Sequence, residues 1–197
     1  MLVFWKPRLV FLATPKAGST AIEVALGSLA SLAVTNPPEL KHTTANRFNR
    51  FLAPYLAVAN GGSFELCALM REPTDWLGSW YRYRQRDGVP PARSTRNMSF
   101  EEFVRAYCQT ERLEFANVGN QSNCLRTRDG GRVQHLFRYE RMEDFVEFLE
   151  DRLDCVITLP RLNVSPAGQT ELSAETAALL RQTLADDYAL YESLLPA

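Results

Sequence analysis

A short apolar run that passes directly into a loop and then into a helical segment constrains the fold of this sequence most. The run is Leu9–Ala13, which lies between Pro7 and Pro15. Unbroken apolar stretches of this length are typical of strands that are buried on both faces. Residues 21–29 then repeat their apolar side chains at the spacing of one helical face. We therefore expect a strand, a short loop and a helix in succession.

The same order of segments recurs twice along the chain. Glu65–Met70 indicates a second buried strand, and Pro73 suits the first turn of a helix that continues to Tyr83. Gln134–Arg138 is a third strand candidate, and it leads into an amphipathic helix at residues 140–153. Strands that alternate with helices predict an α/β fold of three layers, α/β/α, with a central parallel sheet that is covered on both faces.

The remaining segments carry weaker signals. Ser99 with Glu102 forms a capping box at the start of a helix, and Met98 with Phe103 can form its hydrophobic staple. The other expected elements are a helix near 44–56, a surface loop at 87–98, a short edge strand at 156–159 and a terminal helix at about 174–195.

Length and composition favour one soluble domain that spans residues 1–197. Of these residues, 46% are hydrophobic and 23% are charged, as is ordinary for a globular protein. No apolar run approaches the roughly 18 residues of a membrane span, so we expect no span and a cytoplasmic location. The four cysteines lie far apart without a histidine cluster, which favours free thiols in a reducing compartment and no metal site.

The net charge of −1 conceals a division between the two halves of the chain. Residues 1–98 carry 12 Lys and Arg against 6 Asp and Glu, whereas residues 99–197 carry 10 against 17. This asymmetry fits an anionic ligand that is held by the first half, and uneven surface charge without a ligand fits it equally well. We expect no nucleic-acid partner.

The loop after the first strand has the chemistry of a phosphate cradle. A helix that starts directly after a loop presents unpaired backbone N–H groups, and its dipole favours an anion. Lys16 supplies a mobile positive charge, Gly18 permits close approach of the backbone, and neighbouring hydroxyls add donors. The expected phosphate-binding residues are Pro15, Lys16, Ala17, Gly18, Ser19 and Thr20. The loop is not a Walker A motif, because Lys16 precedes the glycine; the alternative is a simple helix cap.

A second anion site is indicated at the end of the second strand. Arg71 follows that strand, and Ser79 comes eight residues later on the next helix. An arginine at a strand end and a serine in the following helix can hold one phosphate from two sides. The alternative is a surface arginine with an unrelated helical serine.

These two motifs resemble those of the sulfotransferases that use 3′-phosphoadenosine-5′-phosphosulfate (PAPS). Thr14-Pro-Lys-Ala-Gly-Ser-Thr20 is similar to the family's 5′-phosphosulfate loop, and Arg71-Glu-Pro with Ser79-Trp-Tyr81 is similar to its 3′-phosphate motif. Phe137-Arg-Tyr-Glu140 and the segment 159–166 resemble the bacterial and carbohydrate branches more weakly. The chain lacks the Gly-rich segment of the cytosolic branch near its C-terminus, so the residues that complete the 3′-phosphate and adenine site are not assigned.

The resemblance implies a P-loop-like sulfotransferase fold related to nucleotide kinases, with PAPS as donor and 3′-phosphoadenosine-5′-phosphate (PAP) as product. The implied acceptor is a hydroxyl of a carbohydrate or another small molecule, and the oligomeric state stays open. Lys16 would stabilise charge on the oxygen that bridges sulfur to the leaving phosphate. No metal is required by this scheme.

A base must take the proton of the acceptor, and the sequence offers few candidates. Of its two histidines, His42 lies between the phosphate loop and the second strand, whereas His135 lies within an expected strand. The ordinary pKa of histidine suits a general base near neutral pH, so we expect His42 to be the base and Glu23 to be the spare candidate.

Two further groups of residues fit more than one interpretation. Trp76, Leu77, Trp80 and Tyr81 have helical spacing that favours core packing. Five arginines between residues 82 and 96 fit either an anionic acceptor or a solvated loop. The competing functions are a kinase-like phosphotransferase and a non-catalytic module that binds adenine nucleotides.

Overall fold

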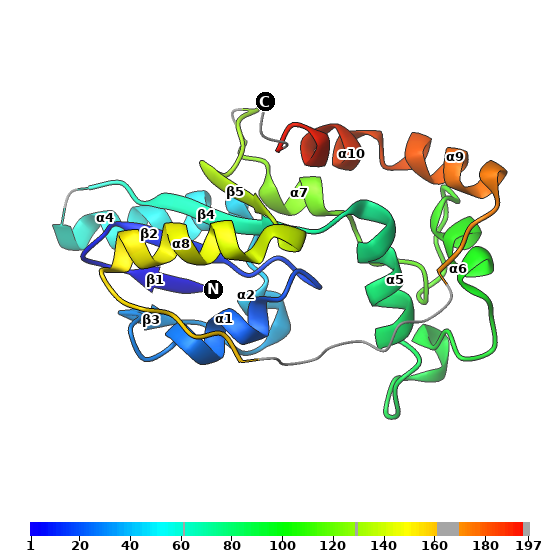
Figure 1. Cartoon of the computed structure of the whole chain (residues 1–197), viewed down its shortest axis with the longest axis horizontal. Coiled ribbons are helices and arrows are strands. Elements are labelled where there is room, and N and C mark those ends of the chain that lie inside the picture. The colour runs from blue at the N-terminus through cyan, green and yellow to red at the C-terminus, as the bar shows by residue number, and fades with distance from the viewer. Residues whose placement is uncertain (61, 129, 161–169, 195–197) are drawn as a thin grey trace. The chain divides into compact units, whose positions relative to one another are not determined.

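The structure is a computed structural model that describes residues 1–60, 62–128, 130–160 and 170–194 (Figure 1). The described residues fall into two compact units, one made of residues 1–71 and 121–160 and the other of residues 72–120 and 170–194. Among the described residues, no helix has both the length and the apolarity needed to cross a membrane.

The first unit contains a sheet of five strands. The strands are β1 (Leu2–Phe4), β2 (Leu9–Leu12), β3 (Leu32–Ala33), β4 (Glu65–Met70) and β5 (His135–Arg138). Their order across the sheet is β3-β1-β2-β4-β5. β2, β4 and β5 pair in parallel, with Leu12 opposite Ala68 and Met70 opposite Arg138. The α/β class is therefore confirmed, and three of the strands coincide with those expected from the sequence.

One strand departs from the expected parallel sheet. β1 pairs antiparallel with both β2 and β3, so it runs against the other four strands. Four residues join β1 to β2, and a connection this short can only return the chain antiparallel. Arg8 completes this turn with a φ of 56°, in the left-handed region. The expected parallel sheet is therefore confirmed for β2, β4 and β5, whereas β1 makes the sheet as a whole mixed.

Helices cover both faces of the sheet. The helices and helical turns of the first unit are α1 (Ser19–Leu26), α2 (Pro38–Lys41), α3 (Ala45–Arg47), the π-helical turn η1 (Phe48–Leu52), α4 (Ala53–Asn60), α7 (Gln121–Leu125), the 3-10 turn η3 (Tyr139–Arg141) and α8 (Met142–Leu153). In Figure 1, α8 lies in front of the strands and α4 lies behind them. This arrangement agrees with the expected layers.

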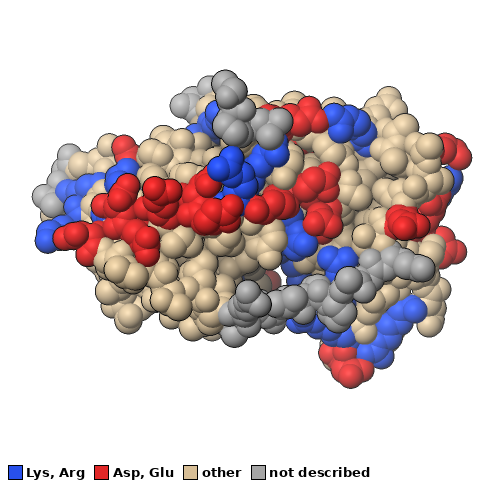
Figure 2. All heavy atoms as spheres, in the orientation of Figure 1, with Lys and Arg blue, Asp and Glu red and all other residues tan. Residues whose placement is uncertain are grey.

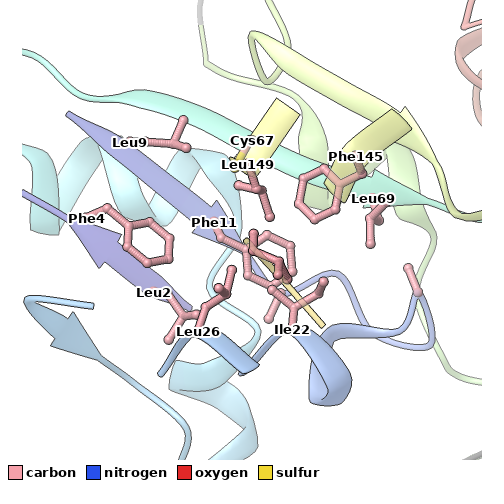
Figure 3. Close-up of a cluster of buried hydrophobic side chains, with 13 residues drawn as sticks. Leu2, Phe4, Leu9, Phe11, Ile22, Leu26, Cys67, Leu69, Phe145 and Leu149 are labelled. Carbon is pink, nitrogen blue, oxygen red and sulfur yellow. The ribbon is translucent and has the colours of Figure 1, made fainter. Parts of the chain in front are cut away.

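The core of the first unit lies between the sheet and the pair α1 and α8 (Figure 3). Phe11 of β2 packs against Phe145 of α8, with ring centroids 5.6 Å apart. Ile22 of α1 belongs to the same buried cluster. Val10 and Leu66, whose side chains point to the other face of the sheet, are also fully buried. The other face of the sheet is therefore covered too.

The second unit is built from helices. They are α5 (Pro73–Tyr83), the 3-10 turn η2 (Pro91–Arg93), α6 (Phe100–Tyr107), α9 (Ala174–Thr183) and α10 (Ala185–Glu192). Trp76 and Leu77 are buried in its apolar cluster, with Trp80 and Tyr81 packed against it, which confirms the core interpretation of these residues. The capping box that starts α6 is also confirmed, because both of its hydrogen bonds form.

Three expected elements differ in the structure. Residues 156–159 form no strand; the N–H of Ile157 donates instead to the Glu150 carboxylate at 2.6 Å. The helix expected at 44–56 continues to residue 60 and contains η1, because Pro54 has no N–H to donate to the carbonyl four residues earlier. The terminal helix is divided at Leu184 into α9 and α10.

The acidic charge of the second half of the chain has a partial explanation in α8. This helix carries five Asp and Glu residues and one arginine. Figure 2 shows acidic side chains gathered in a band over α8. The uneven charge of the sequence is thus in part the charge of one solvated helix face.

Candidate functional site

Two of the expected site segments, and a tyrosine that the sequence did not assign to the site, follow the carboxyl ends of neighbouring parallel strands. The loop Ala13–Gly18 follows β2, Arg71 follows β4, and Tyr139 follows β5. Because these strands are parallel and adjacent, their carboxyl ends meet at one edge of the sheet. Open α/β sheets bind their ligands at this edge. All of these residues belong to the first unit.

The loop after β2 has the backbone of an anion-binding turn. Lys16 has a φ of 65° and Gly18 has a φ of 76°, so two residues of the loop adopt the left-handed conformation. Gly18 is the N-cap of α1, and as a glycine it has no side chain with which to cap the helix. The N–H of Ala21 donates to the Gly18 carbonyl at 3.2 Å, whereas the N–H groups of Ser19 and Thr20 have no acceptor within the helix and no side-chain acceptor from the cap. An anion placed there would accept hydrogen bonds from these N–H groups and would be stabilised by the helix dipole.

Thr14 adds a hydroxyl that sequence reasoning did not assign to the site. Its side chain is buried, and its Oγ1 has no hydrogen-bond partner among the described residues. A buried hydroxyl without a partner costs free energy, unless a ligand accepts its hydrogen. The signal was present in the sequence, since Thr14 opens the loop motif, but its burial could not be derived there.

Tyr139 connects the loop to Arg71. A Cβ atom built on Gly18 would lie 2.8 Å from Cε2 of Tyr139, which is closer than real Cβ contacts. The guanidinium carbon of Arg71 lies 4.8 Å from the centre of the same ring, within cation–π distance. The Tyr139 ring thus contacts both the loop and Arg71. Position 18 requires glycine because its backbone is left-handed and because Tyr139 leaves no room for a Cβ atom.

Gln121 fixes the backbone of Arg71. The N–H of Arg71 donates to Oε1 of Gln121 at 2.9 Å, and Nε2 of Gln121 donates to the carbonyl of Arg71 at 2.8 Å. Gln121 itself is fully buried at the start of α7. These two bonds satisfy the backbone groups of Arg71 at the point where β4 ends. Sequence reasoning missed Gln121, because the contact spans 50 residues and no local pattern marks it.

His42 lies beside the start of the loop. Its Nδ1 is 2.6 Å from the carbonyl oxygen of Ala13, so Nδ1 must carry the hydrogen of this bond. In the neutral ring the other nitrogen, Nε2, then has a free lone pair. Burial lowers the pKa of His42 below its ordinary value, and the nearby Lys41 ammonium lowers it further, while the Ala13 carbonyl raises it. The neutral form that a general base needs is therefore favoured.

Glu23, the spare candidate, is committed to an ion pair. Its carboxylate accepts from Nζ of Lys41 at 2.6 Å, and both side chains are mostly buried. Protonation of this carboxylate would leave the mostly buried ammonium of Lys41 without its ion-pair partner. The structure thus separates the two candidates: His42 presents a lone pair, whereas Glu23 neutralises Lys41.

The other expected residues occupy different places. His135 begins β5, at the opposite end of that strand from Tyr139, where it lies 3.0 Å from a carboxylate oxygen of Glu65. Ser19 is buried and Thr20 is exposed at the start of α1. Ser79 lies on α5 in the second unit, where its side chain is buried. The joint grip of Ser79 and Arg71 on one phosphate stays a prediction.

The arginines between residues 82 and 96 have structural partners within the second unit. Arg84 is buried and donates to the carbonyl of Glu114, while Arg93 pairs with the Glu114 carboxylate at 3.2 Å. Arg96 pairs with Asp87 and donates to the carbonyl of Gln85 at 2.8 Å. These contacts bind the segment to its own unit, which favours the structural interpretation for these three arginines.

Comparison with known proteins adds no family to this description. No protein-family model and no curated protein matches the chain. The site combines a loop with two left-handed residues, a lysine, an arginine and a histidine whose Nδ1 donates to a backbone carbonyl, all at one sheet edge.

Proposed function

We propose that this protein is a sulfotransferase that moves a sulfuryl group from PAPS to an acceptor hydroxyl and releases PAP. The observation that carries the proposal is the common position of the loop, Arg71 and His42 relative to the sheet. The loop and Arg71 follow neighbouring parallel strands, and His42 contacts the residue with which the loop begins. This arrangement supports a P-loop-like sulfotransferase fold, as the resemblance of the loop motifs also implies.

The loop would hold the 5′-phosphosulfate of the donor. Its left-handed backbone at Lys16 and Gly18 supports this assignment, as does the buried hydroxyl of Thr14. Arg71 would bind the 3′-phosphate through its planar guanidinium, with Ser79 as the expected second donor. Pro15 and Ala17 would shape the loop, and Ser19 and Thr20 would contribute the first N–H groups of α1.

The transfer itself needs little covalent chemistry from the protein. The acceptor oxygen forms a bond to sulfur, the bond between sulfur and the bridging oxygen breaks, and PAP leaves with the electron pair. His42 would take the acceptor proton on Nε2, which the Nδ1 bond to Ala13 leaves unprotonated. Lys16 would stabilise the negative charge that grows on the bridging oxygen.

The two competing functions differ from this proposal in what they require. A kinase-like phosphotransferase needs a lysine after the last glycine of the loop, whereas Lys16 precedes Gly18. A non-catalytic nucleotide-binding module needs no base, and it leaves Nε2 of His42, the nitrogen not bonded to Ala13, without a role. The acceptor would be a glycan or another hydroxylated small molecule. The four free cysteines support a reducing compartment such as the cytoplasm.

A thermal-shift comparison of PAP with ATP tests the donor assignment. We expect PAP to raise the melting temperature well above the effect of ATP, which has no 3′-phosphate. Arg71→Ala should weaken PAP binding by about 2 kcal/mol, or roughly thirtyfold, whereas the exposed Arg128→Ala should leave it unchanged. Equal stabilisation by PAP and ATP would contradict the proposal.

A further inference from the structure

The helical stretch that contains η1 and α4 exposes large apolar side chains along one face. Phe51 is 62% exposed, Tyr55 is 74% exposed and Val58 is 89% exposed. Their spacing of four and three residues places them on one side of a helix. Pro54, also exposed, lies between them on the same side. We call Phe51, Pro54, Tyr55 and Val58 the apolar ridge.

The ridge faces solvent although the rest of the stretch is anchored. Phe48 and Leu56, from the same stretch, are buried on the other side. The ridge is thus not a frayed segment but the outer face of a packed helix. Exposed large apolar residues that gather on one face mark a surface that contacts something else.

The charges beside the ridge have one sign. Arg47 and Arg50 are exposed at its start, and the guanidinium of Arg50 lies 5.0 Å from the centre of the Phe51 ring. Residues 40–64 contain no Asp or Glu. Basic residues that flank an aromatic helix face are typical of helices that lie on anionic lipid surfaces.

The opposite face of the sheet carries the opposite charge. α8 holds five acidic residues, and Figure 2 shows acidic side chains gathered over it. α8 and α4 lie on opposite faces of the sheet of the first unit (Figure 1). A negatively charged surface would therefore attract the α4 side and repel the α8 side, which orients the unit as it approaches.

A second copy of this chain is a poorer occupant of the ridge. In a twofold interface, residues 40–64 of each copy would supply no carboxylate to pair with Arg47 and Arg50 of the other copy. A bilayer that contains anionic lipids satisfies both features, because its headgroups pair with the arginines and its interface accepts the aromatic and aliphatic side chains.

We propose that the apolar ridge, with Arg47 and Arg50, docks the protein on an anionic lipid surface. This proposal is independent of the sulfotransferase assignment, since the ridge contains none of the residues placed at the donor site. Binding is peripheral: the helix lies in the interface and does not cross the bilayer. Phe51, Tyr55 and Val58 enter the boundary between headgroups and acyl chains.

Sedimentation with lipid vesicles tests the proposal. The full chain is mixed with vesicles of phosphatidylcholine alone or of phosphatidylcholine with phosphatidylserine, and bound protein is measured at low and high salt. We expect binding to the anionic vesicles only, and a weakening as salt increases. Arg47→Gln and Arg50→Gln should each weaken binding about fivefold. Phe51→Ser with Val58→Ser should weaken it at least tenfold.

Matched variants control for general charge and hydrophobicity. Val156→Ser removes an equally exposed side chain away from the ridge, and Arg86→Gln with Arg128→Gln removes the same charge as Arg47→Gln combined with Arg50→Gln. Both controls should bind vesicles as the wild type does. The melting temperatures of all variants, measured without vesicles, should match the wild type, because every changed side chain is exposed.

Five results would overturn the proposal. The first is an absence of binding to anionic vesicles, and the second is binding that the ridge variants leave unchanged. The third is that Arg86→Gln with Arg128→Gln weakens vesicle binding as much as Arg47→Gln with Arg50→Gln does. That result would assign the effect to net charge. Polyglutamate is added as a competitor. If it displaces the protein from the vesicles as effectively as added anionic vesicles do, an acidic protein partner is indicated instead. Concentration-dependent dimers that Phe51→Ser abolishes would identify a second copy as the occupant.

Discussion

Substitution of Gly18 by alanine probes the contact that joins the loop to Arg71. Gly18 has a φ of 76°, and a side chain in this conformation costs about 1–2 kcal/mol. The added Cβ would also lie 2.8 Å from Tyr139 and 3.3 Å from the methyl carbon of Met142. The methionine can move, but the tyrosine ring is packed against Arg71, so we add about 1–2 kcal/mol for overpacking. The expected loss of unfolding free energy is about 3 kcal/mol.

Gly130→Ala supplies the matched control for this loss. Gly130 has a φ of 81°, but its added Cβ would meet no atom within 4 Å. It should cost only the conformational part, about 1–2 kcal/mol. Urea denaturation that is monitored through amide exchange in β4 measures the loss of unfolding free energy of the first unit in both variants. A double-mutant cycle with Tyr139→Ala should recover about 1 kcal/mol or more of the Gly18→Ala loss. Equal losses for the two glycine variants, with no recovery in the cycle, would refute the role of the Tyr139 contact.

Three other predictions concern the base, the loop lysine and the second unit. His42→Ala should leave PAP affinity within about threefold and lower turnover by roughly 10² to 10⁴. In the wild type, turnover should fall with acid at a midpoint below 6.5, because burial lowers the pKa of His42 and protonation removes its lone pair; a midpoint above 6.5 would argue against this residue. Lys16→Gly should be about 1 kcal/mol more stable than Lys16→Ala, because glycine adopts a φ of 65° without strain, and both variants should lose turnover in a single-turnover assay. Hydrogen bonds from Ser173 and Thr176 lower the pKa of Glu101 to about 2, so their stabilising effect should be complete above about pH 4.5 and lost as the pH falls towards 2. In an acid titration that is monitored through amide exchange in α9, Glu101→Gln should lack this pH dependence. A titration that matches the wild type would count against the role of the Glu101 hydrogen bonds.

The strands that position the site could be predicted because their signal is local. Glu65–Met70 is found within the same bounds in the structure, and Leu9–Leu12 and His135–Arg138 lie within the predicted runs. An apolar run bounded by prolines or polar residues is specified by neighbouring residues alone. The loop and Arg71 could be placed for the same reason, since they follow those strands directly in the sequence.

The short strand β1 could not be predicted in the same way. Three residues, Leu2–Phe4, are too few to establish a period, and the turn to β2 uses Arg8 where a glycine would have marked it. Its pairing on both sides with other strands is a tertiary effect. The predicted strand at 156–159 failed for a related reason, because a side chain, that of Glu150, takes the backbone hydrogen bond that a strand would need.

The contacts within the site lay beyond sequence reasoning, although most of its residues did not. Gln121 and Tyr139 act on Arg71 across 50 and 68 residues of chain, and no spacing rule joins such positions. The sequence could not show that Lys41 pairs with Glu23 while Nδ1 of His42 contacts the Ala13 carbonyl, because both contacts depend on the fold. Residue types indicated the chemistry, and the packing decided which atoms are available for it.

A crystal structure of the protein soaked with PAP tests the central claim most directly. We expect density for the 5′-phosphate against the N–H groups at the start of α1, and density for the 3′-phosphate at the guanidinium of Arg71. Nε2 of His42 should face the side of the 5′-phosphate on which the sulfuryl group would lie. PAP that binds elsewhere, or a 5′-phosphate that leaves the loop empty at saturating ligand, would contradict the assignment of this site to sulfuryl transfer.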